Sequence, residues 1–125
     1  MQLLLVTLLF SLVWTTKTPL PQVLAGSGCA VFNDSIYVIG GRDQSSRYTT
    51  NYIYDPLTDN WSTKANMSVA RAHIGAGVVN GKMYVIGGWV GSSASDVVEE
   101  YDPATDTWTT KRLCPRQDML MQWLL

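Results

Sequence analysis

The sequence contains a direct repeat with a fixed spacing of 47 residues. Residues 28–64 align with residues 75–111 without a gap, and 18 of the 37 aligned positions are identical. Unrelated segments of this length share far fewer residues, so the two segments are copies of one unit. Internal repeats of this period are typical of folds in which one supersecondary unit is stacked on copies of itself. The chain therefore predicts a modular architecture.

Each repeat predicts four short β-strands. The unit opens with small and β-branched residues, turns at Asn-Asp or Asn-Gly, and continues as an apolar run of the kind found in buried strands. A third strand ends at a tyrosine, and a loop rich in Pro and Asp leads to a fourth strand that begins at a tryptophan. The expected strands are residues 28–31, residues 36–39, a third ending at Tyr54 and a fourth starting at Trp61, with counterparts at residues 75–79, residues 83–86, Tyr101 and Trp108.

A four-stranded antiparallel sheet of this size cannot bury both faces alone, so it must stack on similar sheets. The expected fold class is all-β, with two four-stranded antiparallel blades plus one or two extra strands. Trp61 and Trp108 are expected to fill space between the sheets. The same phase places Trp14 47 residues before Trp61. We therefore expect Trp14 to lie on the last strand of a preceding blade.

These residues resemble kelch repeats. The family's marks are the double glycine after the Ile-Tyr-Val-Ile strand, the Tyr-Asp-Pro that follows, and the tryptophan seven residues beyond that tyrosine. The resemblance extends over about residues 14–117 and implies a partial kelch β-propeller, a fold of about six blades when closed. With two full repeats and part of a third, the chain looks like a fragment of a longer kelch protein. The expected organisation is an apolar segment (1–13), the end of a preceding blade with its linker (14–27), repeat 1 (28–74), repeat 2 (75–117) and an apolar tail (118–125).

The amino-terminal apolar segment allows two interpretations. Residues 3–14 are apolar except for Thr7 and Ser11, which is too short to span a bilayer but suits a signal peptide. No Lys or Arg precedes the segment, and cleavage at the best-matching site, Ala25, would remove the strand expected at Trp14. We therefore favour an unrelated segment and a cytoplasmic location, with secretion as the alternative. No integral membrane span is expected.

Composition excludes several classes of function. The 125 residues include 9 Lys and Arg, a single His and two Cys, and the net charge is −1. A neutral chain without a basic cluster does not predict nucleic-acid binding. One histidine cannot supply most metal sites, including the copper site of kelch enzymes that resemble galactose oxidase. We therefore expect no cofactor, no metal and no catalysis. Cys29, on the first strand, is expected to be a buried thiol.

Binding is the function that the resemblance implies. In kelch-like substrate adaptors, one propeller face carries the loops that hold protein or peptide ligands. Arginine suits carboxylates and phosphates, and tyrosine gives rigid contact area. In this sequence the matching loops are residues 42–48, 66–73 and 89–96. The candidate ligand-binding residues are Arg42, Arg47, Tyr48, Arg71, His73 and Trp89.

Each candidate also has a structural interpretation. Arg42 and Arg47 could belong to a solvated loop, and Arg71 could brace the turn between blades. His73 could cap a turn, and Trp89 could cover a blade edge. The sequence predicts a protein-interaction module whose partner is a protein or peptide, with self-association through open propeller ends as a further expectation. The alternative is a fragment of a secreted or surface carbohydrate-related kelch protein or enzyme.

Overall fold

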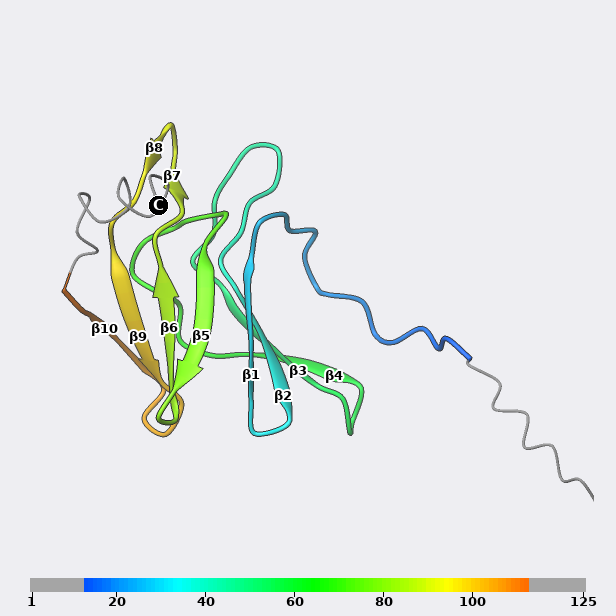
Figure 1. Cartoon of the computed structure of the whole chain (residues 1–125). Helices are drawn as coiled ribbons and strands as arrows, with labels where there is room; N and C mark the ends of the chain where they lie inside the picture. The colour runs from blue at the N-terminus through cyan, green and yellow to red at the C-terminus, as the bar shows by residue number, and fades with distance from the viewer. Residues whose placement is uncertain (1–12, 113–125) are drawn as a thin grey trace, which may run out of the picture.

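Two antiparallel sheets of four strands each lie side by side (Figure 1). The computed structural model describes residues 13–112, so the predicted tail at 118–125 and nearly all of the segment 1–13 lie outside it. The described part is all-β, as predicted, and contains no helix. Blade 1 comprises β1 (Gly28–Phe32), β2 (Ser35–Ile39), β3 (Asn51–Asp55) and β4 (Asn60–Thr63). Blade 2 comprises β5 (Gly75–Val79), β6 (Lys82–Ile86), β9 (Val98–Asp102) and β10 (Thr107–Thr110).

Both blades are simple meanders in which each strand pairs with the next strand of the sheet. The β1–β2 turn has positive φ at Asn33 and Asp34 (45° and 58°), and the β5–β6 turn has it at Asn80 and Gly81 (49° and 73°). These values correspond to a type I′ turn, which matches the right-handed twist of the strands that it joins. The hairpins expected from the Asn-Asp and Asn-Gly pairs are therefore confirmed.

The extra strands do not lie where the sequence predicted one. A small hairpin of β7 (Trp89–Val90) and β8 (Ser93–Ala94) rises from the β6–β9 connection. The strand expected at Trp14 is absent, and its side chain is 99% exposed. The prediction was wrong because a last strand needs a neighbouring third strand to pair with, and no described segment supplies one at Trp14.

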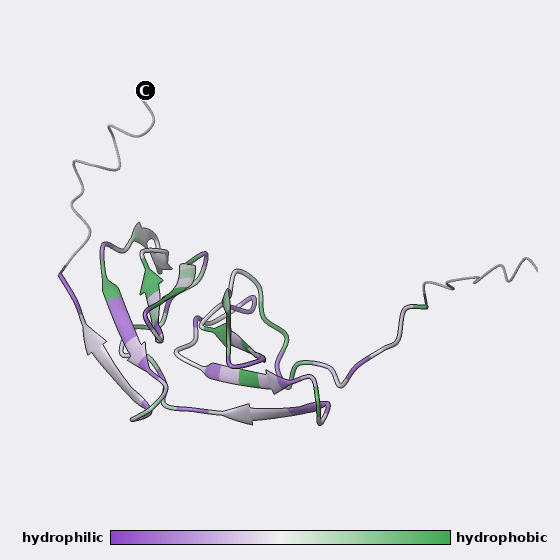
Figure 2. Ribbon diagram, turned by 60° about the horizontal axis from the view of Figure 1, so that its bottom comes forward, coloured by the Kyte–Doolittle hydropathy of each residue, from purple (hydrophilic) through white to green (hydrophobic). Residues whose placement is uncertain are grey.

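The core lies between the two blades. Ala30, Tyr37, Ile39 and Ile53 form one side of this core, and each is 9% exposed or less. On the other side, Met83, Val85 and Tyr101 of blade 2 have no exposed surface. Figure 2 shows hydrophobic residues on β2 and β6, whereas the outer strands β4 and β10 are pale and most of β9 is hydrophilic. Stacking thus buries the face that a single sheet would leave open.

A tryptophan fastens each blade to the linker before it. Trp61 packs on Tyr54 with ring centroids 5.0 Å apart, and its indole N–H donates to the Thr18 carbonyl at 2.8 Å. Trp108 repeats this arrangement, with Tyr101 at 5.0 Å and the Ala65 carbonyl at 2.7 Å. Both tryptophans are partly buried. Trp108 packs against the core between the blades, as predicted. Trp61 lies on the opposite face of blade 1, which no described blade covers, so it does not fill space between two sheets.

An aspartate completes the same fastening. Asp106 accepts hydrogen bonds from the backbone N–H of Ala65 at 2.9 Å and from the hydroxyl of Tyr101 at 2.8 Å. Asp59 makes the equivalent contacts with Thr18 and Tyr54. Thr18 and Ala65 lie 47 residues apart, so the repeat phase continues upstream into the linker.

Cys29 is exposed, contrary to the expected buried thiol. Neighbouring residues of a strand point to opposite faces of the sheet. Gly28 and Ala30 of β1 are buried on the side of blade 2, so Cys29 faces away from that blade. The sequence did not reveal which face of the first strand would be covered.

Candidate functional site

The long connections of both blades rise at the same end of the sheets (Figure 1). In blade 1 the connection between β2 and β3 spans residues 40–50, and in blade 2 the β7–β8 hairpin occupies the corresponding place between β6 and β9. We call this end the loop end. Its geometry decides which of the predicted binding residues are available to a partner.

The residue after each double glycine has a fixed backbone and an exposed side chain. Arg42 exchanges two backbone hydrogen bonds with Ala25, at 2.8 and 2.9 Å. Trp89 exchanges the same pair with Ala72, at 3.2 and 2.8 Å. Arg42 is exposed, and Trp89 retains 46% of its surface. The repeat thus presents a cation in one blade and an indole in the next from equivalent backbone positions.

Asp43 organises the loop that contains Arg47 and Tyr48. Its carboxylate accepts from the backbone N–H groups of Ser45 and Ser46 at 2.8 and 2.7 Å, and from the Tyr48 hydroxyl at 2.5 Å. The hydrogen bond from Tyr48, followed by those from the two amides, holds the pKa of Asp43 well below its usual range. The same bond to Asp43 raises the pKa of Tyr48. Tyr48 is therefore a neutral hydrogen-bond donor at physiological pH.

Arg47 joins the two blades at the loop end. One of its guanidinium nitrogens donates to the Gly91 carbonyl at 2.6 Å, and Gly91 lies in the β7–β8 hairpin. Arg47 also forms a backbone bridge with Arg42. This contact places the Arg42 loop and the Trp89 hairpin next to each other.

A shallow hollow of about 220 Å³ lies beside Arg42. Its walls combine the Arg42 and Asp43 side of the loop with the apolar linker residues Val23 and Leu24. Val23 is 89% exposed. The hollow therefore presents apolar surface next to a guanidinium group.

His73 is exposed on the linker that enters blade 2. Its backbone has a positive φ of 54°, and its N–H donates to the Gly26 carbonyl at 2.6 Å. Gly26, at the equivalent position before blade 1, has a similar φ of 67°. The backbone of His73 therefore serves the turn, while its imidazole remains accessible.

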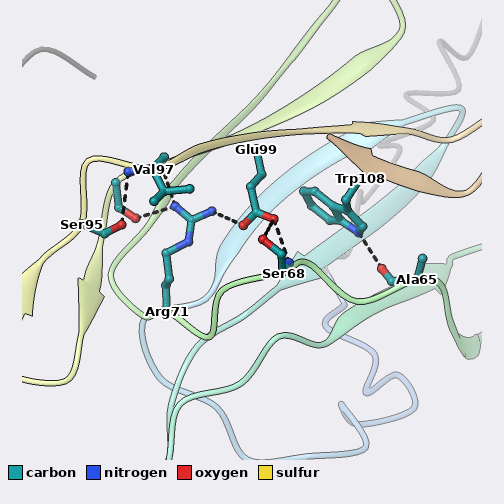
Figure 3. A network of polar contacts seen from close by, with 8 residues as sticks. Ala65, Ser68, Arg71, Ser95, Val97, Glu99 and Trp108 are labelled. Carbon is teal, nitrogen blue, oxygen red and sulfur yellow. Dashed lines mark hydrogen bonds and ion pairs between the residues drawn. The ribbon is translucent and has the colours of Figure 1, made fainter. Parts of the chain in front are cut away.

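Arg71 does not belong to the exposed set. Its side chain has no exposed surface and forms an ion pair with Glu99 at 2.7 Å (Figure 3). It also donates to the backbone carbonyls of Gly87 and Val97, each at 2.9 Å. This geometry supports the bracing interpretation of Arg71, because every contact is made inside the chain.

Glu99 is the residue that the sequence reasoning missed. Its second carboxylate oxygen accepts from the backbone N–H and the hydroxyl of Ser68, at 2.7 and 2.6 Å. A signal was present in the sequence: Glu99 and Glu100 are adjacent on a strand, so one of them must point into the sheet packing. A buried carboxylate needs a cation, and Arg71 was the available candidate.

Residues 13–112 contain no group of three or more His, Cys, Asp or Glu side chains that could hold a metal ion. Within the same range, no helix is long and apolar enough to cross a membrane.

Stacked four-stranded meanders joined by repeated linker contacts are blades of a β-propeller. The family described as Kelch motif matches the chain at residues 24–68 and again at residues 70–111. The chain therefore belongs to the kelch-repeat family, as the sequence resemblance predicted. No curated protein matches the chain. The match supports a protein-interaction propeller in general terms, because kelch repeats typically mediate protein interactions.

Proposed function

We propose that the loop end binds a protein or peptide partner, without catalysis by this chain. The observation that carries the proposal is the bond between Arg47 and Gly91, which joins the loops of the two blades into one surface. Arg42, Trp89 and His73 are exposed on that surface. Arg71 is left out because it is buried.

The residue types at the loop end suit protein recognition. Arginine, tyrosine and tryptophan are enriched at the energetic centres of protein interfaces. Arg42 can bind a carboxylate through two parallel hydrogen bonds, and Trp89 can cover an apolar side chain of the partner. Asp43 holds the Arg42 loop in shape by accepting four hydrogen bonds from Ser45, Ser46 and Tyr48, so less ordering is required on binding.

The absence of catalysis is part of the proposal. Nucleophilic and acid–base mechanisms need a reactive group within hydrogen-bond reach of a base. His73 and Cys29 are both exposed, and no hydrogen bond links their side chains within the described range. The interaction role needs only the exposed side chains and the braced backbone.

Selection of peptides from a random display library on the immobilised chain would test the proposal. We expect the selected peptides to bind about 10-fold more weakly, a loss of roughly 1.4 kcal/mol, to the Arg42→Ala/Trp89→Ala variant. Leu57→Ala is the matched control, because Leu57 is 93% exposed in the β3–β4 turn at the opposite end of blade 1. Peptides whose affinity falls in the Leu57 variant and not in the loop-end variant would overturn the proposal.

A further inference from the structure

The contact between the blades uses two different faces of the repeat. We define face A as the side that blade 1 presents to blade 2, with Ala30 and Tyr37 in its centre, and face B as the side that blade 2 presents to blade 1, with Met83 and Val85 in its centre. Because the repeat phase is constant, blade 2 also has a face A and blade 1 a face B. Within the described residues, no blade covers either of these two faces.

Face A of blade 2 keeps the glycines of a packed face but lacks the packing. A Cβ added at Gly28 of blade 1 would lie 3.0 Å from side-chain atoms of Ala76 and Ile74. At the equivalent Gly75 of blade 2, the nearest atom is the Ile86 carbonyl oxygen at 3.8 Å, and at Gly77 nothing lies within 4 Å. Blade 2 thus fills the space next to Gly28 on face A of blade 1, whereas the space next to Gly75 and Gly77 on face A of blade 2 is open.

The apolar residues of this face show the same difference. Ile39 of blade 1 has no exposed surface, whereas its equivalent Ile86 is 46% exposed. Val79 is 58% exposed, although its equivalent Phe32 packs against the core. Together with the two glycines, these exposed side chains give the face an apolar part along β5 and at the Ile86 end of β6.

The rest of the same face is polar, but its charges are paired. Lys111 lies 3.1 Å from Glu100, which also accepts a hydrogen bond from the Tyr84 hydroxyl at 2.6 Å. Lys82 forms an ion pair with Asp102. Since each of these charges has a partner, covering this part with an uncharged surface leaves none of them buried without one.

Face B of blade 1 is such an uncharged surface. It repeats the valine, tyrosine and tryptophan residues of the face that packs inside the molecule: Val31, Val38, Tyr54 and Trp61 stand for Val78, Val85, Tyr101 and Trp108. Val31 is 65% exposed and Ile36 is 37% exposed. Cys29 is exposed on the same face. The apolar part of face B of blade 1 therefore resembles face B of blade 2, the surface that packs on face A of blade 1.

We propose that face A of blade 2 binds face B of blade 1 of a second copy of this chain. The occupant follows from the contact inside the molecule, where a face A already packs on a face B of the same residue pattern. The interface is heterologous, so further copies add head to tail, either into a closed ring or into an open chain. It uses the sides of the blades and leaves the proposed binding surface at the loop end free.

Substitutions on the two faces provide a specific test. Gly77→Glu places a carboxylate on face A of blade 2, at a site where nothing obstructs a side chain. Val31→Glu does the same on face B of blade 1, where the side chain is 65% exposed. We expect the unchanged chain to sediment as species larger than a dimer at low micromolar concentration, and each variant alone to sediment as a monomer.

Mixing the two variants distinguishes the proposed interface from nonspecific aggregation. The Gly77 variant retains face B and the Val31 variant retains face A, so an equimolar mixture should form a 1:1 dimer that grows no further. Val79→Lys is a second face A variant with the same expectation, and Arg42→Ala should assemble like the unchanged chain. A monomeric unchanged chain, variants that assemble undiminished, or a mixture that stays monomeric would each overturn the proposal. Peptide binding at the loop end by the monomeric variants separates this result from the proposed function.

Discussion

Arg71 and Glu99 form an ion pair with nitrogen and oxygen 2.7 Å apart, and their side chains are only 0% and 1% exposed. One repeat earlier, the same two positions hold Leu24 and Tyr52. The second blade therefore has a buried ion pair where the first blade has an aliphatic and an aromatic residue. Glu99 also holds Ser68, so the pair connects the linker to the strands at two points.

Removing one partner of this ion pair should lower the stability of the fold, and replacing both partners by the residues of the first repeat should restore much of it. We expect Arg71→Leu or Glu99→Tyr alone to lower the free energy of unfolding by about 3–5 kcal/mol, because each leaves a buried charge without its partner. The double variant, which reproduces Leu24 and Tyr52, should lose less than either single variant. Urea unfolding of all four chains gives the double-mutant cycle. Additive losses would contradict this account.

The tryptophan fastening predicts a graded loss of stability. Trp108→Ala should lower the free energy of unfolding by about 3 kcal/mol, since it removes the ring packed on Tyr101. Trp108→Phe should cost about 1 kcal/mol, mainly through loss of the hydrogen bond to the Ala65 carbonyl. Trp14→Ala is the control, with an expected change close to zero because the side chain is 99% exposed. Denaturant unfolding followed by circular dichroism measures all three.

Gly88 and Gly77 differ in backbone conformation and in the space around them, so they should respond differently to substitution. Gly88 has a φ of 93°, and a Cβ there would lie 2.7 Å from the Ala72 carbonyl oxygen. We expect Gly88→Val to lower the melting temperature by several degrees or to prevent folding, because both the backbone and the space resist it. Gly77→Ala, with nothing within 4 Å, should leave the melting temperature within about 2 °C of its starting value. An equal fall in melting temperature for both variants would show that the loss of glycine, and not the local packing, determines the effect.

Acid should weaken the contacts between linker and blade. The backbone N–H of Ala65, and next the Tyr101 hydroxyl, lower the pKa of Asp106 below its ordinary value of 3.8. A carboxylate with a lower pKa in the folded state stabilises the fold above its unfolded pKa, and this contribution disappears as the pH falls through the folded pKa. We therefore expect the urea midpoint to fall between about pH 5 and pH 2. Asp106→Asn should show a lower midpoint at pH 7 and a weaker dependence on acid.

The repeat made most of the fold predictable. Glycines, the hairpin turns and the Tyr–Trp spacing each fix a local conformation, so the strands that contain Tyr37, Tyr54 and Trp61 follow from neighbouring residues. Trp14 carries the same local pattern, yet it forms no strand. Strand formation also requires a hydrogen-bonded neighbour, and that is a property of distant residues.

The candidate site was predictable to a smaller extent. The position after the double glycine pointed to Arg42 and Trp89, and both side chains are exposed, although Trp89 lies on the short strand β7 and not in a loop. Their binding role stays a prediction. Arg71 was expected either to bind a ligand or to brace the turn between blades, and the choice between the two depends on Glu99, which is 28 residues away. The contact of Arg47 with Gly91 was equally hidden, because it joins loops of two different blades.

The hydrogen bonds of Thr18 and Ala65 also determine which segment of this protein could be excised as a unit. The second blade depends on Ala65, Ser68 and Arg71, all of which precede its first strand. A cut between β4 and Ala65 keeps that set together, whereas a cut directly before β5 separates the sheet from the residues that anchor Trp108 and neutralise Glu99. Each blade thus depends on residues of the linker that precedes its first strand. An insertion in the linker before β5 would therefore disturb the blade that follows it before the blade from which it departs.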